Sequence, residues 1–97
     1  MGTTENNKYK IYRSKKFLKA VKVCQKRNYN MKLLDEVVEI LSRGEKLPRK
    51  YKDHALKGKF KGTRECHILP DWLLTYKIYE DKLFLYLLDT GTHDDVF

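Results

Sequence analysis

The sequence predicts an α+β fold in which a helical hairpin packs on one face of a mainly antiparallel sheet, in the order β-α-α-β-β-β. Apolar residues recur at helical spacing in the first half of the chain and alternate at strand spacing in the second half. With 97 residues, the chain has room for a single domain with one modest core. We expect a disordered lead over residues 1–7 and one folded domain over residues 8–97.

The first half of the chain is predicted to form one strand and two helices. Residues 8–13 alternate and indicate a short strand. Ser14 is a good N-cap for a helix that runs to about Arg27, and Asn30 can cap a second helix over residues 31–43. The apolar stripe of the first helix contains Phe17, Ala20, Val21 and Cys24. A tight turn between the two helices makes them antiparallel neighbours.

The second half is predicted to contain a basic loop and three strands. Residues 46–62 show no sustained period, and we expect a loop there with a short strand around Phe60. Strands are predicted over 64–69, 72–79 and 83–89, separated by Pro-Asp and Glu-Asp-Lys turns. In the first of these strands, one face carries Cys66 and Ile68, and the other carries Glu65, His67 and Leu69.

The net charge of +8 is unevenly distributed. Between Lys8 and Arg27 there are nine Lys or Arg and no acid, and between Lys46 and Arg64 there are eight against one Asp. Segregated positive charge favours a polyanion such as nucleic acid, although a solvated face or an acidic protein partner fits as well. Tyrosine, with seven residues, is unusually plentiful.

The sequence also indicates the cellular compartment in which the protein is expected. The longest apolar runs fall far short of the ~20 residues that cross a bilayer, and the polar N-terminus lacks the apolar segment of a secretory signal. Cys24 and Cys66 have no metal-ligand spacing, so we expect buried thiols rather than a disulfide or a zinc site. We therefore expect a cytoplasmic protein that does not associate with membranes.

Three histidines are the candidate catalytic groups. His54, His67 and His93 each lie beside Gly, Pro or Asp, where loops or strand edges are expected. A single histidine is more often structural, but imidazole titrates near ~6.5, so two of them can divide base and acid work. On RNA, one would take a proton from a 2′-hydroxyl and another would give a proton to the leaving 5′-oxygen. This chemistry needs no metal and no cofactor.

Basic and aromatic residues could hold the RNA. The basic candidates for phosphate binding are Lys52, Lys57, Lys59, Lys61 and Arg64. Trp72 and the terminal Phe97 could stack on bases, which is worth ~1–3 kcal/mol per base. Alternation slightly favours core packing for Trp72, whereas Phe97 follows two aspartates and is expected to be exposed.

Three phrases, YKDHALKG, RECHILPDW and TGTHDDVF, make the chain resemble the RelE superfamily of bacterial toxins, and its YafQ-type branch most closely. The resemblance runs from the first strand to the last residue. It implies an endoribonuclease (mRNA interferase) that cuts messenger RNA in the A site of the 70S ribosome and leaves a 2′,3′-cyclic phosphate, which inhibits translation. It also implies a cognate antitoxin that neutralises the toxin, and binding to operator DNA only together with that antitoxin.

Residue by residue, the resemblance assigns catalytic positions to His54, His67, Asp71 and His93. It assigns substrate contacts to Trp72 and Phe97. One departure is Leu88-Asp89, where the family usually has an arginine that binds the scissile phosphate. An acid there would repel phosphate by ~1 kcal/mol in bulk water and by more where water is excluded. Either Lys52, Lys61 or Arg64 replaces the arginine, or Asp89 turns away, or the enzyme is weak.

Two alternatives stay open. A relative that has lost cleavage would act as an antitoxin-binding, promoter-repressing module, and only the missing arginine supports it. A ParE-like poison of DNA gyrase would share the scaffold, but such chains generally lack this set of histidines.

Overall fold

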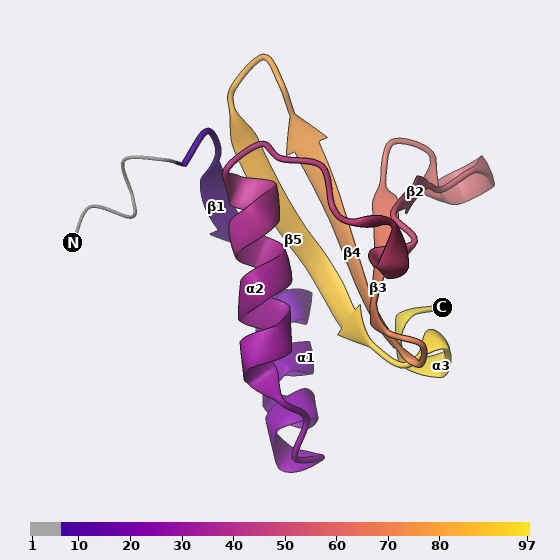
Figure 1. Cartoon of the computed structure of the whole chain (residues 1–97). Helices are drawn as coiled ribbons and strands as arrows, with labels where there is room; N and C mark the ends of the chain where they lie inside the picture. Colours follow the sequence, from indigo (N-terminus) through magenta and orange to yellow (C-terminus); the bar gives the residue numbers. More distant parts are fainter. Residues whose placement is uncertain (1–6) are drawn as a thin grey trace.

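A computed structural model describes residues 7–97, so residues 1–6 of the predicted lead lie outside the described part of the chain. The elements are β1 (Lys10–Arg13), α1 (Lys15–Lys26), α2 (Met31–Ser42), η2 (Arg49–Tyr51), β2 (His54–Ala55), η3 (Gly58–Phe60), β3 (Arg64–Leu69), β4 (Trp72–Tyr79), β5 (Phe84–Gly91) and α3 (His93–Val96). They form one sheet in the order β1-β5-β4-β3-β2 (Figure 1). Only β1 pairs in parallel, with β5, and the other pairs are antiparallel. The predicted α+β class is confirmed.

Both helices begin at the predicted caps. The hydroxyl of Ser14 accepts a hydrogen bond from the backbone N–H of Phe17 at 2.9 Å, and the Asn30 side chain accepts one from the N–H of Lys32 at 3.2 Å. Each cap satisfies a backbone donor that has no partner inside its helix. Both helices have 12 residues. Among the described residues, no helix is long and apolar enough to cross a membrane.

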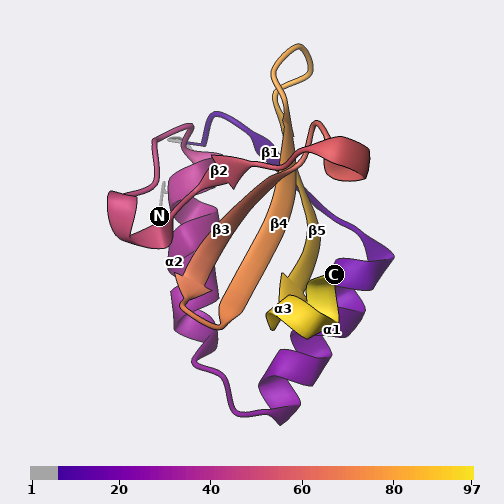
Figure 2. The same ribbon diagram turned by 90° about the vertical axis from the view of Figure 1, so that its right-hand side faces the viewer.

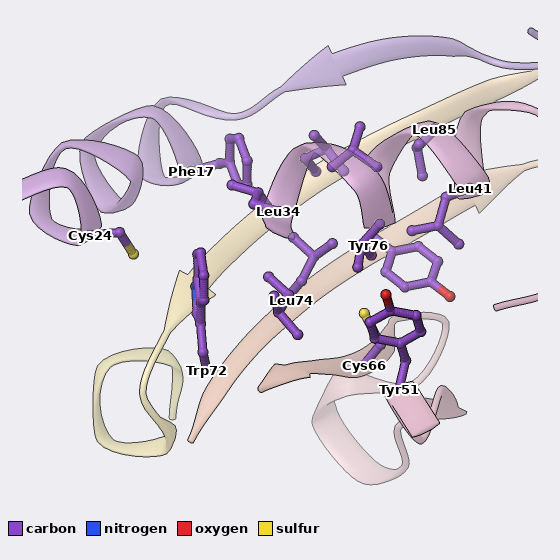
Figure 3. Packing of buried hydrophobic residues seen from close by; sticks show 14 of the residues in the cluster. Phe17, Cys24, Leu34, Leu41, Tyr51, Cys66, Trp72, Leu74, Tyr76 and Leu85 are labelled. Atoms are coloured by element: carbon purple, nitrogen blue, oxygen red, sulfur yellow. The ribbon is translucent and has the colours of Figure 1, made fainter. Parts of the chain in front are cut away.

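The core lies between the two long helices and one face of the sheet (Figure 3). Its largest fully buried side chains are Val37, Leu74, Tyr76, Leu85 and Leu87. Both cysteines are buried and free, as the sequence predicts. Burial raises the pKa of the Cys66 thiol, which therefore stays uncharged and is a poor nucleophile.

Three local features differ from the predictions. The expected strand around Phe60 is wrong, because Gly58–Phe60 forms a 3₁₀ turn and the short strand lies earlier, at His54–Ala55. The last strand continues to Gly91 instead of ending at Asp89. The short helix α3 follows it, where the sequence reading assigned no element. Figure 2 shows α3 in front of the sheet and α2 behind it, so the two helices cover opposite faces.

Candidate active site

The face of the sheet opposite α2, here called the open face, carries two of the three histidines. Side chains alternate along a strand, so Glu65 and His67 of β3 point away from the buried side chains of Cys66 and Ile68. His54 of β2 pairs with Glu65 in the antiparallel register and lies on the same face. The strand register therefore brings together two imidazoles that are 13 positions apart in the sequence.

The carboxylate of Glu65 lies between these two rings. Its Oε1 is 3.2 Å from Nε2 of His54 and 3.8 Å from Nε2 of His67, and the ring centroids are 6.5 Å apart. The Glu65 side chain is 8% exposed, whereas those of His54 and His67 are 48% and 28% exposed. A buried carboxylate is costly unless a cation or donor faces it. Glu65 is therefore placed to accept a hydrogen bond from Nε2 of His54.

The other nitrogen of each ring fixes its orientation. Nδ1 of His54 lies 2.8 Å from the carbonyl oxygen of Lys52, so both nitrogens of this ring face acceptors. Only the imidazolium, with two N–H donors, satisfies both contacts. Nδ1 of His67 lies 3.3 Å from the carbonyl oxygen of Pro70. Donation at that nitrogen leaves Nε2 of His67 with a lone pair that is free to accept a proton.

The backbone before His54 is held by Asp53 and Lys52. The carboxylate of Asp53 accepts hydrogen bonds from Arg64 at 2.8 and 3.2 Å and from the hydroxyl of Tyr76. Lys52 adopts a left-handed conformation with φ 51°, which is uncommon for a residue other than glycine. The Asp-His pair of the sequence motif thus combines a structural aspartate with a candidate catalytic histidine.

The side chain of Arg64 does not lie where a phosphate-binding residue was expected. The expectation of a phosphate contact is not supported, because β3 alternation puts its side chain on the face opposite His67. Its guanidinium pairs with Asp53, and this contact raises the pKa of Arg64. The remaining predicted phosphate-binding residues, Lys52, Lys57, Lys59 and Lys61, are exposed.

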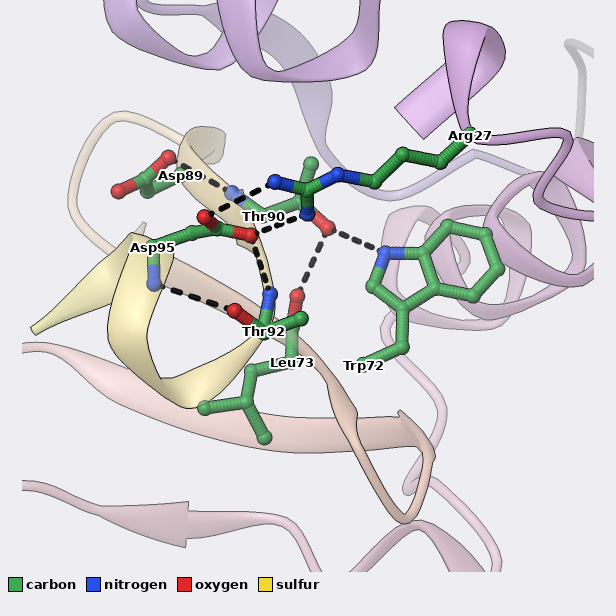
Figure 4. A network of polar contacts seen from close by, with 7 residues as sticks. All are labelled: Arg27, Trp72, Leu73, Asp89, Thr90, Thr92 and Asp95. Atoms are coloured by element: carbon green, nitrogen blue, oxygen red, sulfur yellow. Dashed lines mark hydrogen bonds and ion pairs between the residues drawn. The ribbon is translucent and has the colours of Figure 1, made fainter. Parts of the chain in front are cut away.

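The third histidine lies in α3, which Thr92 begins. The hydroxyl of Thr92 accepts from the N–H of Asp95 at 3.2 Å, and the Asp95 carboxylate accepts from the N–H of Thr92 at 2.8 Å, which forms a capping box. Arg27 at the end of α1 donates two hydrogen bonds to the same carboxylate, at 2.6 and 3.3 Å (Figure 4). This Arg27–Asp95 contact ties α3 to α1.

Phe97 joins the C-terminus to the basic loop. Its ring centroid is 5.2 Å from that of His93 and 5.2 Å from that of Phe60, which it meets edge to face. Phe97 is 44% exposed, in agreement with the expectation for a terminal aromatic residue. His93 therefore lies beside the loop that carries Lys59 and Lys61, and the two other histidines lie at the opposite end of that loop.

The surroundings of Trp72 and Asp71 are not those expected of residues that bind substrate. Trp72 is 2% exposed, and its indole N–H donates to the hydroxyl of Thr90 at 2.9 Å (Figure 4). The expectation that Trp72 stacks on a base does not fit this placement, since core atoms cover the ring. Asp71 is exposed and lines a cavity of about 330 Å³ next to Tyr29 and Asn30, in the loop between α1 and α2.

Asp89 turns toward α1. A bulge between Thr75 and Tyr76 of β4 leaves Leu88 of β5 unpaired and changes the direction of the next residue. The Asp89 side chain is 8% exposed, lies 3.4 Å from Nζ of Lys16, and accepts from the N–H of Thr90 at 2.9 Å. Asp89 pairs with Thr75, the neighbour of Glu65 across the sheet, so its contact with Lys16 offsets the charge of the acid that stands in place of the arginine.

Glu65 and Arg27 are the two residues that the sequence analysis missed as parts of this site. The alternation of β3 already places Glu65 on the face of His67, two positions away, but it does not show that the carboxylate is buried. Nothing local in the sequence links Arg27 to Asp95, which is 68 positions further on. Across residues 7–97, no three histidine, cysteine or acidic side chains converge in a way that could hold a metal ion.

The fold is that of the RelE-like α+β class. A family described as "Bacterial toxin of type II toxin-antitoxin system, YafQ" matches residues 9–97. The mRNA interferase toxin YafQ of Escherichia coli K12 is 44% identical over 85 residues, which are 87% of this chain and 90% of that protein. The chain belongs to the YafQ toxin family.

Solved structures agree with this assignment. The toxin in the E. coli DinJ-YafQ toxin-antitoxin complex superposes with a TM-score of 0.85 at 38% identity, over 93% of this chain and 98% of that one. A metal-bound toxin from Helicobacter pylori gives a TM-score of 0.86 at 44% identity, over 92% of this chain and 99% of that one.

The burial of Trp72 predicts a loss of stability on Trp72→Phe. The variant removes the N–H that faces Thr90 and leaves a gap in the core, so the free energy of unfolding should fall by about 1–3 kcal/mol. Urea denaturation measures the change, with Phe97→Leu as the exposed control, which should stay within about 0.5 kcal/mol of wild type. Equal stability of Trp72→Phe and wild type would show that the indole is not part of the core.

The Arg27–Asp95 contact predicts a dependence of stability on pH. Hydrogen bonds from Arg27 and from Thr92 lower the pKa of Asp95 below its usual range. Since the folded-state pKa is depressed, the stabilisation is full above the unfolded value of ~3.9 and is lost as the pH falls through the folded value. Wild type should therefore unfold less readily than Asp95→Asn at neutral pH, and the difference should shrink below pH ~4. A difference that does not change with pH would contradict the contact.

Proposed function

We propose that the chain is a metal-independent endoribonuclease that cleaves translated mRNA in the A site of the 70S ribosome. In this proposal a 2′-hydroxyl attacks the adjacent phosphate, giving a 2′,3′-cyclic phosphate and a 5′-hydroxyl and so inhibiting translation. The observation that supports it most directly is the buried Glu65 carboxylate, which faces two accessible imidazoles on the open face of a basic protein. The name mRNA interferase of the E. coli relative supports the same class of reaction.

The contacts of the two rings suggest their roles. His67, whose Nε2 carries a free lone pair when Nδ1 donates to Pro70, would accept the proton of the 2′-hydroxyl. His54, held as the imidazolium between Lys52 and Glu65, would give its proton to the leaving 5′-oxygen.

The remaining groups would bind and orient the RNA. His93 and Phe97 border the site at the C-terminus, where Phe97 offers an exposed ring for a base. Lys52, Lys59 and Lys61 would offset the charge that grows on the phosphate, in place of the arginine usual in the family. Asp71 stays a proposed contributor, although its surroundings are those of the loop between α1 and α2.

We also propose that a cognate antitoxin neutralises the protein in the cytoplasm. The E. coli relative forms a toxin-antitoxin complex with DinJ, and the net positive charge of this chain suits an acidic partner segment. Binding to operator DNA would occur only together with the antitoxin.

A catalytically weak, antitoxin-binding relative is the second candidate. Its support is Asp89, which stands where the family usually has an arginine. Because Nζ of Lys16 lies 3.4 Å from this carboxylate, its negative charge is offset and its repulsion of a phosphate is reduced. Compared with the family, the site then lacks only the cation of that arginine. We therefore expect cleavage at a reduced rate rather than none.

Cleavage of a translated message tests the proposal. Primer extension after translation in vitro should reveal new 5′ ends with wild type, and His54→Ala, His67→Ala and His93→Ala should each lower the cleavage rate by about 10²–10⁴-fold. Lys22→Ala, on the outer face of α1, is the control and should cleave like wild type. A chelator of transition metals, which spares the magnesium of the ribosome, should not change the rate.

Two results would contradict the nuclease. Cleavage by wild type that survives all three histidine substitutions would place the chemistry elsewhere. No cleavage by wild type, with tight antitoxin binding, would favour the second candidate. A message with a 2′-deoxy sugar at the cut position should resist cleavage, since the attacking hydroxyl is missing.

A further inference from the structure

The open face carries a second cluster of functional groups, away from the histidines. Tyr12 of β1 pairs with Tyr86 of β5, and Tyr79 of β4 pairs with Phe84 of β5. These four rings are called the aromatic patch. They line a hollow of about 400 Å³, together with Arg13 and Lys82.

The aromatic patch shares its sheet face with the histidine site. His67 is level with Leu73 of β4, and side chains at every second position from Leu73 reach Lys77 and Tyr79 on the same face. Six residues of strand separate Leu73 from Tyr79, which is ~20 Å. A few nucleotides of an extended single strand would span this distance.

The patch is accessible and its rings are held in place. Tyr12 is 38% exposed, and its ring centroid lies 4.5 Å from that of Phe84 at an angle of 57°. Lys10 places its ammonium 5.7 Å from the ring of Tyr12, and Lys77 places its own 5.0 Å from the ring of Tyr79. The rings of Tyr12 and Tyr79 thus each have an ammonium group beside them.

The charge around the patch decides between two kinds of partner. Aromatic residues are enriched in protein interfaces too, but lysine is depleted there. Here lysines and an arginine surround the rings, and the side chains that line the hollow include no carboxylate. Rings for stacking, combined with cations for phosphates, are the features of single-stranded nucleic-acid binding surfaces.

We propose that the aromatic patch binds bases of single-stranded RNA, as a continuation of the strand held at His54 and His67. The inference rests on the proposed function for the identity of the RNA, and it adds a contact distant from the cleaved bond. Tyr12 would stack on a base, and Lys10, Arg13 and Lys82 would face phosphates.

Binding of non-cleavable RNA tests this inference separately from catalysis. A fluorescent 2′-O-methylated RNA of about twelve nucleotides, within the size range of single-strand sites, is titrated with the purified protein. Loss of one stacked base, worth ~1–3 kcal/mol, predicts that Tyr12→Ala weakens binding about 5- to 150-fold. Tyr12→Phe keeps the ring and should restore most of the affinity. Leu18→Ala, an exposed truncation on α1, is the matched control and should bind like wild type.

A second variant keeps the rings and removes a charge. Lys82→Gln should reduce the slope of log affinity against log salt by about one unit of counterion release. A trinucleotide, too short to reach from the histidines to the patch, should be affected much less by Tyr12→Ala. Circular dichroism shows whether each variant is folded.

The outcomes separate the two proposals. Binding of the long RNA by Tyr12→Ala and Lys82→Gln with wild-type affinity and salt slope would overturn the inference, while cleavage lost in the histidine variants would still support the nuclease. Unchanged RNA affinity with loss of antitoxin co-purification would assign the patch to a protein partner and also overturn it. Weakened binding by Tyr12→Ala, recovered by Tyr12→Phe, is the expected result.

Discussion

The site depends on one buried carboxylate. Glu65 is almost inaccessible, yet its Oε1 faces His54 at 3.2 Å, and its Oε2 has no hydrogen-bond partner among the described residues. A carboxylate in this position is tolerable only if positive charge stands in front of it. The ring of His54 places a donor in front of Oε1, and both imidazoles are accessible on the open face. Burial of Glu65 thereby makes its contact with His54 part of what stabilises the sheet.

Two aspartates hold the segments that carry His54 and His93. Asp53, held by Arg64 and Tyr76, fixes the short strand that carries His54. Asp95, held by Arg27 and the capping box, fixes the helix that carries His93. Both attachments join a loop or a terminus to a core element. Segments of this kind open at low free energy when nothing ties them down, so these acids limit the motion of the segments that carry His54 and His93.

Periodicity was sufficient to predict the two long helices, the strands β3 and β4 and the layered arrangement, because each buries one face of a regular element. It could not show that β1 pairs in parallel with β5, since that contact joins residues more than 70 positions apart. The capping box of Thr92 and Asp95 can be recognised in the sequence. It indicates the short helix α3, which was not predicted. For the site, residue chemistry proposed the three histidines as candidates, and the strand register brings His54 and His67 to the same carboxylate. The direction of Arg64 followed from the same alternation that placed His67, whereas the direction of Asp89 depends on a bulge that no local pattern reveals.

The protonation state of His54 tests the central claim most directly. Nitrogen-15 NMR of the imidazole rings at neutral pH, assigned with a His54→Gln variant, reports whether each ring nitrogen carries a proton. The account predicts that Nε2 of His54 carries a proton in wild type and donates it to Glu65, and that Glu65→Gln changes the resonance of this nitrogen. A wild-type His54 with a lone pair on Nε2, facing the Glu65 carboxylate, would contradict it.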